Sequence, residues 1–294
     1  MKPAPFDYVR PRTLDEAVQA LAGRPEAKVL AGGQSLVPLL SMRLAAPSLL
    51  VDINALPDLD HVRVDETGVR IGALARHARV LADPEVRRVQ PLVSLALANV
   101  AHPTIRNRGT TVGSLVHADA AAEMPMVLRL LEGSVDVAGP SGRRTIEAAD
   151  LYVGPLESSL HHDEIAVEAF FPTLPARTGV AFEEISRRHG DYAMCGVAAL
   201  VTLDGGGAVS RVRAGYLSAS DVPAVVDLTE PLAGGITPAS LEQAAAVALT
   251  QLDPETDIHA TAAYRAHLVE VLTARVVTAA YQNASEHTHQ STQE

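Results

Sequence analysis

Short apolar runs alternate with helix-like segments through the first part of the chain. Buried strands are predicted at 27–32 ("AKVLAG") and 49–53 ("LLVDI"), because glycine, proline or polar residues bound each apolar run. The segment 13–23 has the spacing of a short helix that ends at its last residue, a glycine. Thr13 followed by Glu16 predicts a capping box at its start.

The alternation continues to about residue 172. A hairpin is predicted at 61–64 and 68–74, around Glu66-Thr67-Gly68. The other predicted elements are helices at 36–43, 76–82, 91–100 and about 123–131, and strands at 134–139, 144–148 and 164–172. Residues 101–125 lack periodicity, and a long irregular segment inside a compact domain is typical of a functional loop.

The pattern changes after the proline-containing segment 173–179, which is the predicted domain boundary. Three long strands follow at 180–188, 195–204 and 208–218, and their spacing indicates an antiparallel meander. Two helices are predicted to end the fold, at about 237–251 and 260–282. The polar residues beyond them predict a disordered tail.

Two glycines and a polar pair follow the first buried strand, in "AGGQS" (31–35). Glycine permits positive φ and close approach, so backbone N–H groups there can converge on an anion, and the start of the next helix adds a partial positive charge. Gln34 and Ser35 can donate further hydrogen bonds. The stretch therefore predicts a diphosphate cradle that uses neither lysine nor arginine, although a tight turn is the alternative.

A second glycine-bearing stretch, "RNRGTTVGS" (106–114), lies in the irregular segment. Two such loops can bind the pyrophosphate of a dinucleotide from both sides, whereas a single glycine-bearing loop is more typical of an ordinary connection. Asp119 and Glu123 follow in "HADAAAEMP" (117–125), where a carboxylate can accept hydrogen bonds from ribose or ribityl hydroxyls. Each carboxylate taken singly can equally be a helix cap or a solvated charge.

The composition is that of a folded, acidic chain. Its 294 residues are 47% hydrophobic with a formal net charge of −11, which indicates a sizeable core and argues against bulk attraction to nucleic acid or anionic lipid. The single cysteine, Cys195, excludes an internal disulfide framework and any four-cysteine metal site in this chain. No signal-peptide core or membrane-length apolar stretch occurs, so a cytoplasmic location is expected.

These motifs together resemble the FAD-binding medium subunits of the molybdenum hydroxylases, the relatives of carbon monoxide dehydrogenase and xanthine dehydrogenase. The resemblance covers nearly the whole chain, in order. It is carried by "FDYVRPRTLDEAVQAL" at the N-terminus, "AGGQSLVPLLSMRLAAPSLLVDI", "IRNRGTTVGSLVHADAAAEMP" and "EEISRRHGDYAMCGVAALVTLD".

The resemblance implies an α+β fold with a PCMH-type FAD-binding domain at 1–175, made of two α/β subdomains at about 1–55 and 56–175. A C-terminal domain at 176–285, with a three-stranded antiparallel sheet and helices, would follow it. The predicted disordered tail then covers 286–294.

The resemblance also assigns cofactor-binding residues. They are Ala31, Gly32, Gly33, Gln34 and Ser35 on one side of the pyrophosphate, flanked by Val29, Leu30 and Leu36, and Thr110, Thr111, Val112, Gly113 and Ser114 on the other. Glu123 would be an acidic residue facing FAD, and Tyr192, in "GDYA", an aromatic near the isoalloxazine. Val100 and Ala166 would be weaker apolar contacts.

One residue departs from the family pattern. The usual second loop reads Thr-Ile-Gly-Gly followed by Ser or Asn, whereas this chain has Val112 at the first glycine. A β-branched residue resists positive φ, so a loop that needs such a backbone at this position would have to be re-shaped.

The implied function is that of an FAD-carrying electron-transfer subunit. In such complexes a large subunit with a molybdopterin-type molybdenum cofactor hydroxylates the substrate, and a small subunit with two [2Fe–2S] clusters conducts the electrons. FAD on the medium subunit then passes them to an external acceptor. The expected assembly is a heterotrimer or its dimer. No catalytic acid, base or nucleophile and no metal ligand is assigned to this chain.

Two alternatives remain open from the sequence. One is a stand-alone PCMH-type flavin oxidoreductase, which would need a substrate pocket of its own. The other is a non-redox nucleotide-binding scaffold, which would not require the aromatic Tyr192. The substrate of the complex is also open among carbon monoxide, a purine, an aldehyde and an N-heterocycle.

Overall fold

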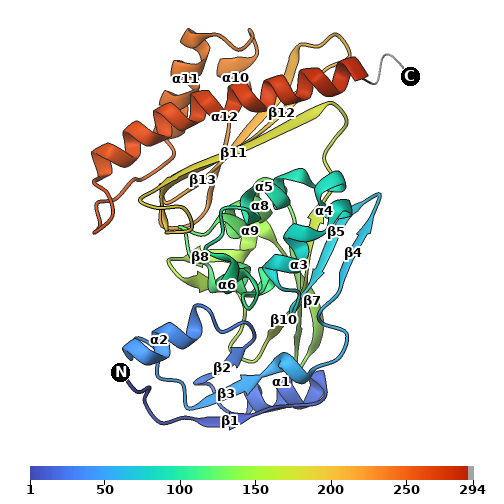
Figure 1. Ribbon diagram of the computed structural model, residues 1–294, viewed down its shortest axis with the longest axis vertical. Coiled ribbons are helices and arrows are strands. Elements are labelled where there is room, and N and C mark those ends of the chain that lie inside the picture. Colours follow the sequence, from blue (N-terminus) through green and yellow to red (C-terminus); the bar gives the residue numbers. More distant parts are fainter. Residues whose placement is uncertain (291–294) are drawn as a thin grey trace.

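Three main sheets follow one another along the long axis of the molecule (Figure 1). The computed structural model describes residues 1–290, with side chains up to residue 286. The N-terminal sheet lies at one end, a larger mixed region of sheet and helices in the middle, and the C-terminal sheet with its long helix at the other end (Figure 1). The chain thus runs from one end of the molecule to the other.

The N-terminal unit is a parallel three-stranded sheet in the order β1-β3-β2. Its elements are β1 (Asp7–Val9), α1 (Leu14–Ala22), β2 (Ala27–Leu30), α2 (Leu36–Met42), β3 (Leu49–Asp52) and the 3₁₀ turn η1 (Ile53–Ala55). Because β2 and β3 are parallel neighbours, the residues that follow both strands meet at one edge of the sheet. The first glycine-bearing loop lies at that edge.

The helix start predicted at Thr13 forms, but its capping box is only half formed. The Thr13 hydroxyl accepts a hydrogen bond of 3.2 Å from the Glu16 amide. The Glu16 carboxylate accepts instead from the Arg12 amide, at 2.8 Å. Gly23 caps the other end, as predicted.

The middle unit is an antiparallel five-stranded sheet in the order β4-β5-β10-β6-β7, with helices packed on it. Its strands are β4 (Val62–Asp65), β5 (Gly68–Gly72), β6 (Ser134–Gly139), β7 (Gly142–Glu147) and β10 (Ile165–Pro172), with a small hairpin of β8 (Tyr152–Gly154) and β9 (Glu157–Ser158). Its helices are α3 (His77–Ala82), α4 (Pro84–Val89), α5 (Pro91–Leu97), α6 (Pro103–Arg106), α7 (Thr111–His117), α8 (Glu123–Leu130) and α9 (Ala148–Leu151).

The C-terminal unit contains the predicted antiparallel sheet with one strand more than expected. The three long strands are β11 (Thr178–Ser186), β12 (Ala193–Leu203) and β13 (Val209–Leu217), and the short β14 (Ala224–Asp227) pairs with β13 to give a four-stranded sheet. Its helices are α10 (Thr229–Leu232), α11 (Pro238–Leu249) and α12 (Ala262–Gln290). The sheet and α12 enclose a second apolar core.

Helix α8 joins the middle unit to the C-terminal sheet. A methyl group on Gly215 of β13 would lie 2.5 Å from the Met126 sulfur and 3.3 Å from the Leu130 Cβ, so the helix rests directly on the strand. Val180 and Leu217 accordingly belong to the same apolar core as the middle unit. The two units therefore share buried surface.

Helix α12 extends beyond the predicted end at residue 282. A methyl group on Gly179 of β11 would lie 2.1 Å from the Ala280 carbonyl oxygen, so the helix lies against the bare backbone of the strand. The Asn283 side chain accepts a hydrogen bond of 3.0 Å from the Val180 amide. The helix ends at Gln290, so the predicted disordered tail is wrong up to that residue, and 291–294 lie outside the described residues.

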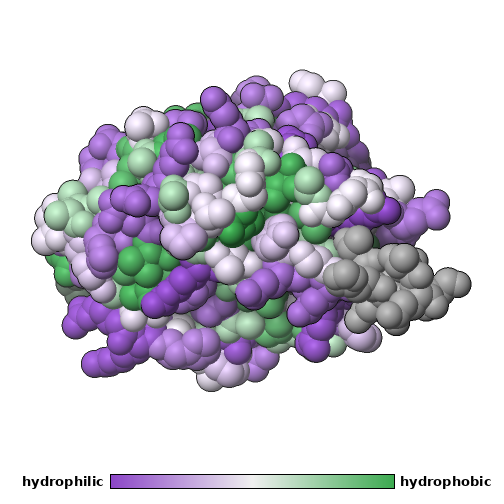
Figure 2. Space-filling view, turned by 90° about the horizontal axis from the view of Figure 1, so that it is seen from above, coloured by the Kyte–Doolittle hydropathy of each residue, from purple (hydrophilic) through white to green (hydrophobic). Residues whose placement is uncertain are grey.

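No helix among the described residues is long and apolar enough to cross a membrane. Viewed from the end that carries α10, α11 and α12, the surface mixes polar residues with small separate apolar areas (Figure 2). That end of the molecule does not present one continuous apolar face.

Candidate functional site

The first glycine-bearing loop, residues 31–35, leads from β2 into α2. Gly32 is buried, and a methyl group on it would lie 2.5 Å from the Arg108 carbonyl oxygen and 2.8 Å from the Gly109 Cα. Gly33 has a φ of 72°, in the left-handed region that favours glycine. One glycine therefore admits the backbone of another segment, and the other turns the chain into α2.

The second glycine-bearing loop, residues 106–114, runs from the end of α6 into the first turn of α7, and the residues just before and at the start of α3 pair with it. Backbone hydrogen bonds of 3.0 and 3.3 Å pair residues 109–111 with residues 75–77. The Thr110 hydroxyl caps α7 by accepting from the Gly113 amide at 3.2 Å. The second loop is therefore the capped start of a helix.

Val112 occupies the first turn of α7 and is 2% exposed. It is not among the residues with positive φ, so its backbone has a conformation that β-branched residues adopt readily. The re-shaping considered for a valine at this position is therefore not needed. The structure uses the side chain in the core and keeps the backbone amide at the helix start.

The two loops touch at Gly32, which brings both halves of the predicted cradle together. Within residues 1–290, the amides of Gly32, Gly33, Gln34 and Val112 donate no hydrogen bond. Gly32 and Val112 are buried and Gly33 and Gln34 are partly buried, and a buried amide without a protein partner indicates a ligand or ordered water. The touching loops thus present the donors that an anion requires.

Two side chains that the sequence did not single out connect these loops. Asn54, which follows β3 in η1, donates from Nδ2 to the Ala31 carbonyl oxygen at 2.9 Å. Arg76, the residue before α3, donates from Nη2 to the Asn54 Oδ1 at 2.6 Å and from Nη1 to the Arg108 carbonyl oxygen at 2.9 Å. A polar chain therefore runs from the backbone of the first loop to that of the second.

Asp52, at the end of β3, orients this chain. Its Oδ1 accepts from the Asn54 amide at 2.9 Å and from Asn54 Nδ2 at 2.7 Å, and its Oδ2 accepts from the Tyr8 hydroxyl. Burial raises the pKa of Asp52, but the hydrogen bonds from Tyr8 and Asn54 outweigh this and hold it below its usual value. The "LVDIN" sequence was a usable signal, because polar residues that follow a parallel strand lie at a common sheet edge.

A third segment, residues 189–192 of the C-terminal unit, rests on the middle unit. Gly190 has a φ of 81°, and a methyl group on it would lie 2.8 Å from the Ala101 carbonyl oxygen and 2.7 Å from His102 Nδ1. Tyr192 follows with 57% of its surface exposed. Desolvation raises its pKa, and the negative charges of Asp119 and Glu123 raise it further. The structure therefore brings these three predicted residues into one neighbourhood.

Two glutamates near this site, Glu123 and Glu184, have raised pKa values. Desolvation, followed by the charge of Glu184, raises the pKa of Glu123 to about 8. Desolvation also raises the pKa of Glu184 to about 7, and its Oε2 is buried without a hydrogen-bond partner. Glu184 was not among the predicted site residues. Glu123, whose charge acts on Tyr192, and Glu184 therefore carry less negative charge near neutral pH than two ordinary glutamates would.

The remaining predicted contacts are placed as follows. Val29 and Leu30 lie in β2 and Leu36 begins α2, so all three flank the first loop. Val100 is 9% exposed and lies just before the segment that contacts Gly190. Ala166 is buried in β10, opposite Val137, and no hydrogen bond joins it to either loop. Thr111 and Ser114 belong to α7, and Ser35 is the N-cap residue of α2.

Cys195 is fully buried in β12, where it belongs to the C-terminal apolar core. Its burial raises the pKa of the thiol to about 12. A thiol that remains protonated at neutral pH is neither a nucleophile nor a metal ligand.

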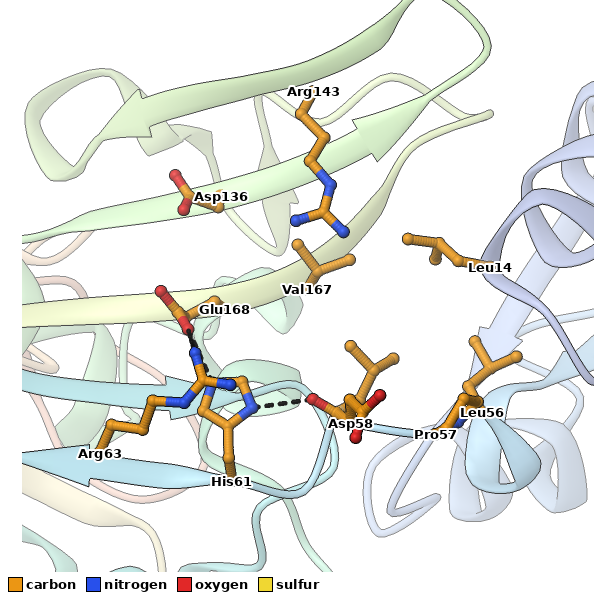
Figure 3. Close-up of a pocket in the computed structure, with 11 residues that line it drawn as sticks. Leu14, Leu56, Pro57, Asp58, His61, Arg63, Asp136, Arg143, Val167 and Glu168 are labelled. Carbon is orange, nitrogen blue, oxygen red and sulfur yellow. Dashed lines mark hydrogen bonds and ion pairs between the residues drawn. The ribbon is translucent and has the colours of Figure 1, made fainter.

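A separate pocket of about 410 Å³ lies between the N-terminal unit and the middle sheet (Figure 3). Its polar centre is Glu168, which contacts His61 at 2.7 Å and Arg70 at 3.2 Å, with Arg63 at 3.9 Å. None of the predicted site residues lines it. The glycine-bearing loops and this pocket are therefore distinct features of the boundary between the two units.

The chain matches known proteins along almost its whole length. Residues 4–174 match the family model described as the FAD binding domain in molybdopterin dehydrogenase, and residues 180–280 match the CO dehydrogenase flavoprotein C-terminal domain. The 6-hydroxypseudooxynicotine dehydrogenase complex subunit alpha of Paenarthrobacter nicotinovorans is 43% identical, over 97% of each chain. The nicotine 6-hydroxylase medium subunit of the same organism is 39% identical, over 94% of this chain and 98% of its own.

Solved structures agree with these matches. The quinoline 2-oxidoreductase of Pseudomonas putida 86 superposes with a TM-score of 0.90 at 35% identity, covering 97% of this chain and 99% of its own. The carbon monoxide dehydrogenase of Hydrogenophaga pseudoflava gives 0.90 at 32% identity, covering 96% and 99%.

The fold and the paired loops define an FAD-binding flavoprotein of the oxidoreductase class. More specifically, the chain belongs to the family of FAD-binding medium subunits of the molybdenum hydroxylases, which includes the carbon monoxide dehydrogenase and xanthine dehydrogenase types. The resemblance and the α+β fold predicted from the sequence are thereby confirmed.

Proposed function

We propose that this chain carries FAD between its two glycine-bearing loops and serves as the electron-transfer subunit of a molybdenum hydroxylase complex. The observation that supports this most directly is the contact of the loops at Gly32, with unpaired amides on both sides of it. A diphosphate fits such a site because it offers many acceptor oxygens and needs donors from two directions.

The residues present fit this cofactor. Loop 31–35 and the first turn of α7 would hold the pyrophosphate through backbone amides. Asp119 and Glu123 would accept hydrogen bonds from its sugar or ribityl hydroxyls, and Tyr192 would cover the flavin ring. A shielded carboxyl with a raised pKa, such as that of Glu123, can also donate a hydrogen bond near neutral pH.

When bound, FAD would supply the redox chemistry, taking electrons from [2Fe–2S] clusters on a small partner subunit and giving them to an external acceptor. A large partner subunit would hold the molybdenum cofactor and the substrate. This chain's own residues bind and orient the flavin, and no acid, base or nucleophile is required of them. We further propose a heterotrimer or its dimer in the cytoplasm, with domains at 1–175 and 176–285 in this chain.

We also propose an N-heterocyclic substrate for the complex. The relatives at 43% and 39% identity are named for 6-hydroxypseudooxynicotine and nicotine, and a structural neighbour is named for quinoline. The substrate pocket would lie on the large subunit, so the test is co-expression of this chain with both partner subunits, followed by turnover assays with nicotine, quinoline and carbon monoxide in parallel. Turnover of carbon monoxide alone would contradict it.

The test of the cofactor is an absorbance spectrum of the full-length chain, before and after acid release of bound flavin. The expected result is a flavin spectrum with FAD, and not FMN, in the released fraction. A colourless chain that cannot be reconstituted with FAD, alone or with its partner subunits, would contradict the proposal. The non-redox scaffold would then be the better description.

A further inference from the structure

The two glycine-bearing loops come from different units of the fold, and few covalent constraints set the distance between them. The first follows a strand of the N-terminal sheet, and the second lies between helices of the middle unit. Their contact at Gly32 involves only bare backbone. The polar chain through Asn54 and Arg76, called here the Asn54–Arg76 bridge, connects the carbonyl groups of Ala31 and Arg108 on either side of that contact.

Arg76 is well suited to hold two partners at a fixed spacing. Its guanidinium is a planar fork whose donors point in set directions, and here two nitrogens reach acceptors that belong to different units. The backbone of Arg76 also forms an isolated antiparallel β-bridge with Thr110. Arg76 therefore fixes the second loop through its backbone and the first loop through Asn54.

The bridge also places a positive charge beside the first loop, which has no charged side chain of its own. The first loop and its flanking residue, 31–36, contain no lysine or arginine, whereas the second stretch, 106–114, contains Arg106 and Arg108. Burial lowers the pKa of Arg76, and the nearby charge of Arg108 lowers it further, yet arginine remains protonated at any physiological pH. Two guanidinium groups thus lie near the contact of the loops.

We propose that Arg76, acting through Asn54 and the Arg108 carbonyl, is a positioning residue that sets the gap between the two loops for a diphosphate and adds positive charge beside the first loop, which contains no lysine or arginine. This inference rests on the proposed function, because the diphosphate is that of FAD. The expected class of ligand is broader than FAD, because the binding of any nucleoside diphosphate, including ADP, should depend on Arg76.

A second pocket, next to the Asn54–Arg76 bridge, allows a chemical-rescue test of the role of Arg76. It has a volume of about 390 Å³ and is lined by both members of the bridge, together with Asp58, Asp60 and Arg79 among others. The space vacated by Arg76→Ala would therefore be open to a small cation from solution. Guanidinium ion has the shape and donors of the missing group, so it should restore what the variant loses.

The experiment measures FAD and ADP affinity of the full-length apo chain, by flavin fluorescence and calorimetry, with the melting temperature recorded for each variant. Arg76→Ala is expected to weaken both ligands roughly 10- to 100-fold, as expected for the loss of charge-assisted hydrogen bonds. Guanidinium chloride far below its denaturing range should restore most of the affinity, whereas equal sodium chloride should not. Arg76→Lys keeps the charge but loses the fork, so it should lie between the two.

Arg79→Ala is the matched control. Arg79 lies in α3, three residues after Arg76, and lines the same pocket, but it pairs with Asp60 and makes no hydrogen bond to either loop. The affinities of the Arg79→Ala variant for FAD and ADP should remain within about twofold of those of the wild-type chain, because surface ion pairs contribute little. Wild-type affinity in Arg76→Ala, or a loss that follows a lower melting temperature and is not restored by guanidinium, would overturn the inference. A wild-type chain that binds neither ligand would instead overturn the proposed function.

Discussion

The two glycine-bearing loops look alike in sequence but are built differently. The first uses one glycine to admit a neighbouring backbone and another, at φ 72°, to turn the chain. Within residues 106–114 no residue has a positive φ, and the second loop is the capped start of α7. Glycine content alone therefore does not specify the conformation of a phosphate-type loop.

This difference determines where each loop gets its stability. The second loop is stabilised by its own residues, through the Thr110 cap and the buried Val112, and also by backbone hydrogen bonds to residues 75–77. The first has no side-chain cap at Ser35 and depends on contacts with Arg108 and with the Asn54–Arg76 bridge. We therefore expect the first loop to respond to changes in its neighbours and the second to changes in its own residues.

The largest expected effect comes from Gly32→Ala. The added methyl group would overlap the Arg108 carbonyl oxygen, which is backbone and cannot rotate away, so the loops must separate. Overpacking of this kind costs about 3 kcal/mol or more, and we expect FAD affinity to fall about 100-fold. Flavin titration of the purified chain measures it. Gly234→Ala is the control, because a methyl group at Gly234 meets open space. Normal FAD binding by Gly32→Ala would show that the first loop does not depend on close contact with the second.

Val112→Gly tests the second loop by restoring the usual family residue. Losing a buried valine side chain and adding a helical glycine should lower the free energy of unfolding by about 2–3 kcal/mol. FAD affinity should be unchanged, because the amide at this position is retained. Urea unfolding and flavin titration provide the two measurements. Tighter FAD binding by the variant would mean that valine strains the loop after all.

The acidic residues beyond the second loop predict a dependence of stability on pH. The pKa values of Glu123 and Glu184, about 8 and about 7, lie above the 4.5 of an unperturbed glutamate. Between about pH 4.5 and pH 8, the folded chain therefore binds more protons than the unfolded chain. Its stability should fall as the pH rises through this range, by at most about 1.4 kcal/mol per pH unit for each extra proton.

Glu184→Gln should flatten this decline and lower the pKa of Glu123, because it removes the neighbouring charge. Melting temperatures of the apo chain from pH 5 to 8 measure the dependence of stability on pH, and carboxyl NMR of Glu123 measures its pKa. Glu183→Gln is the matched control on the same strand, because its carboxylate pairs with Arg275 at the surface. A slope that is identical in wild type and Glu184→Gln would refute the interaction.

The smallest effect is expected at the helix caps. Thr110→Ala removes the hydroxyl that accepts from the Gly113 amide and should cost about 1 kcal/mol of stability. Thr13→Ala removes the equivalent cap of α1 at a similar cost. Only the first should also weaken FAD binding, as judged by titration, and Thr110→Ser should restore it. Equal FAD affinities in the two alanine variants would show that the cap does not position the loop.

Much of the fold was predictable where local pattern and tertiary structure agree. The three long C-terminal strands are apolar runs that the sequence marks clearly. Helix α4 was missed because Asp83-Pro84 reads as a break, although Asp83 caps that helix and Pro84 occupies its first turn. Helices α6 and α7 were missed within 101–125, because helices of four and seven residues are too short to show a period.

In the candidate site, too, the features marked by local sequence could be predicted and the long-range contacts could not. The loops could be found because glycine and hydroxyl residues mark them locally, whereas the Asn54–Arg76 bridge joins residues 22 positions apart. Each of its members has an ordinary appearance in the sequence. Glu184 was also missed, because its unpaired buried oxygen follows from packing between units and not from its neighbours in the chain.

The backbone contact between Gly179 and α12 has a consequence for engineering. It places residues 280–284 against the first strand of the C-terminal unit, so the beginning and the end of that unit are adjacent. Adjacent ends are the condition under which a domain accepts circular permutation or insertion into a host protein. A short linker could therefore join them, and new termini could be opened in the exposed turn at Gly205-Gly206-Gly207 without cutting a strand.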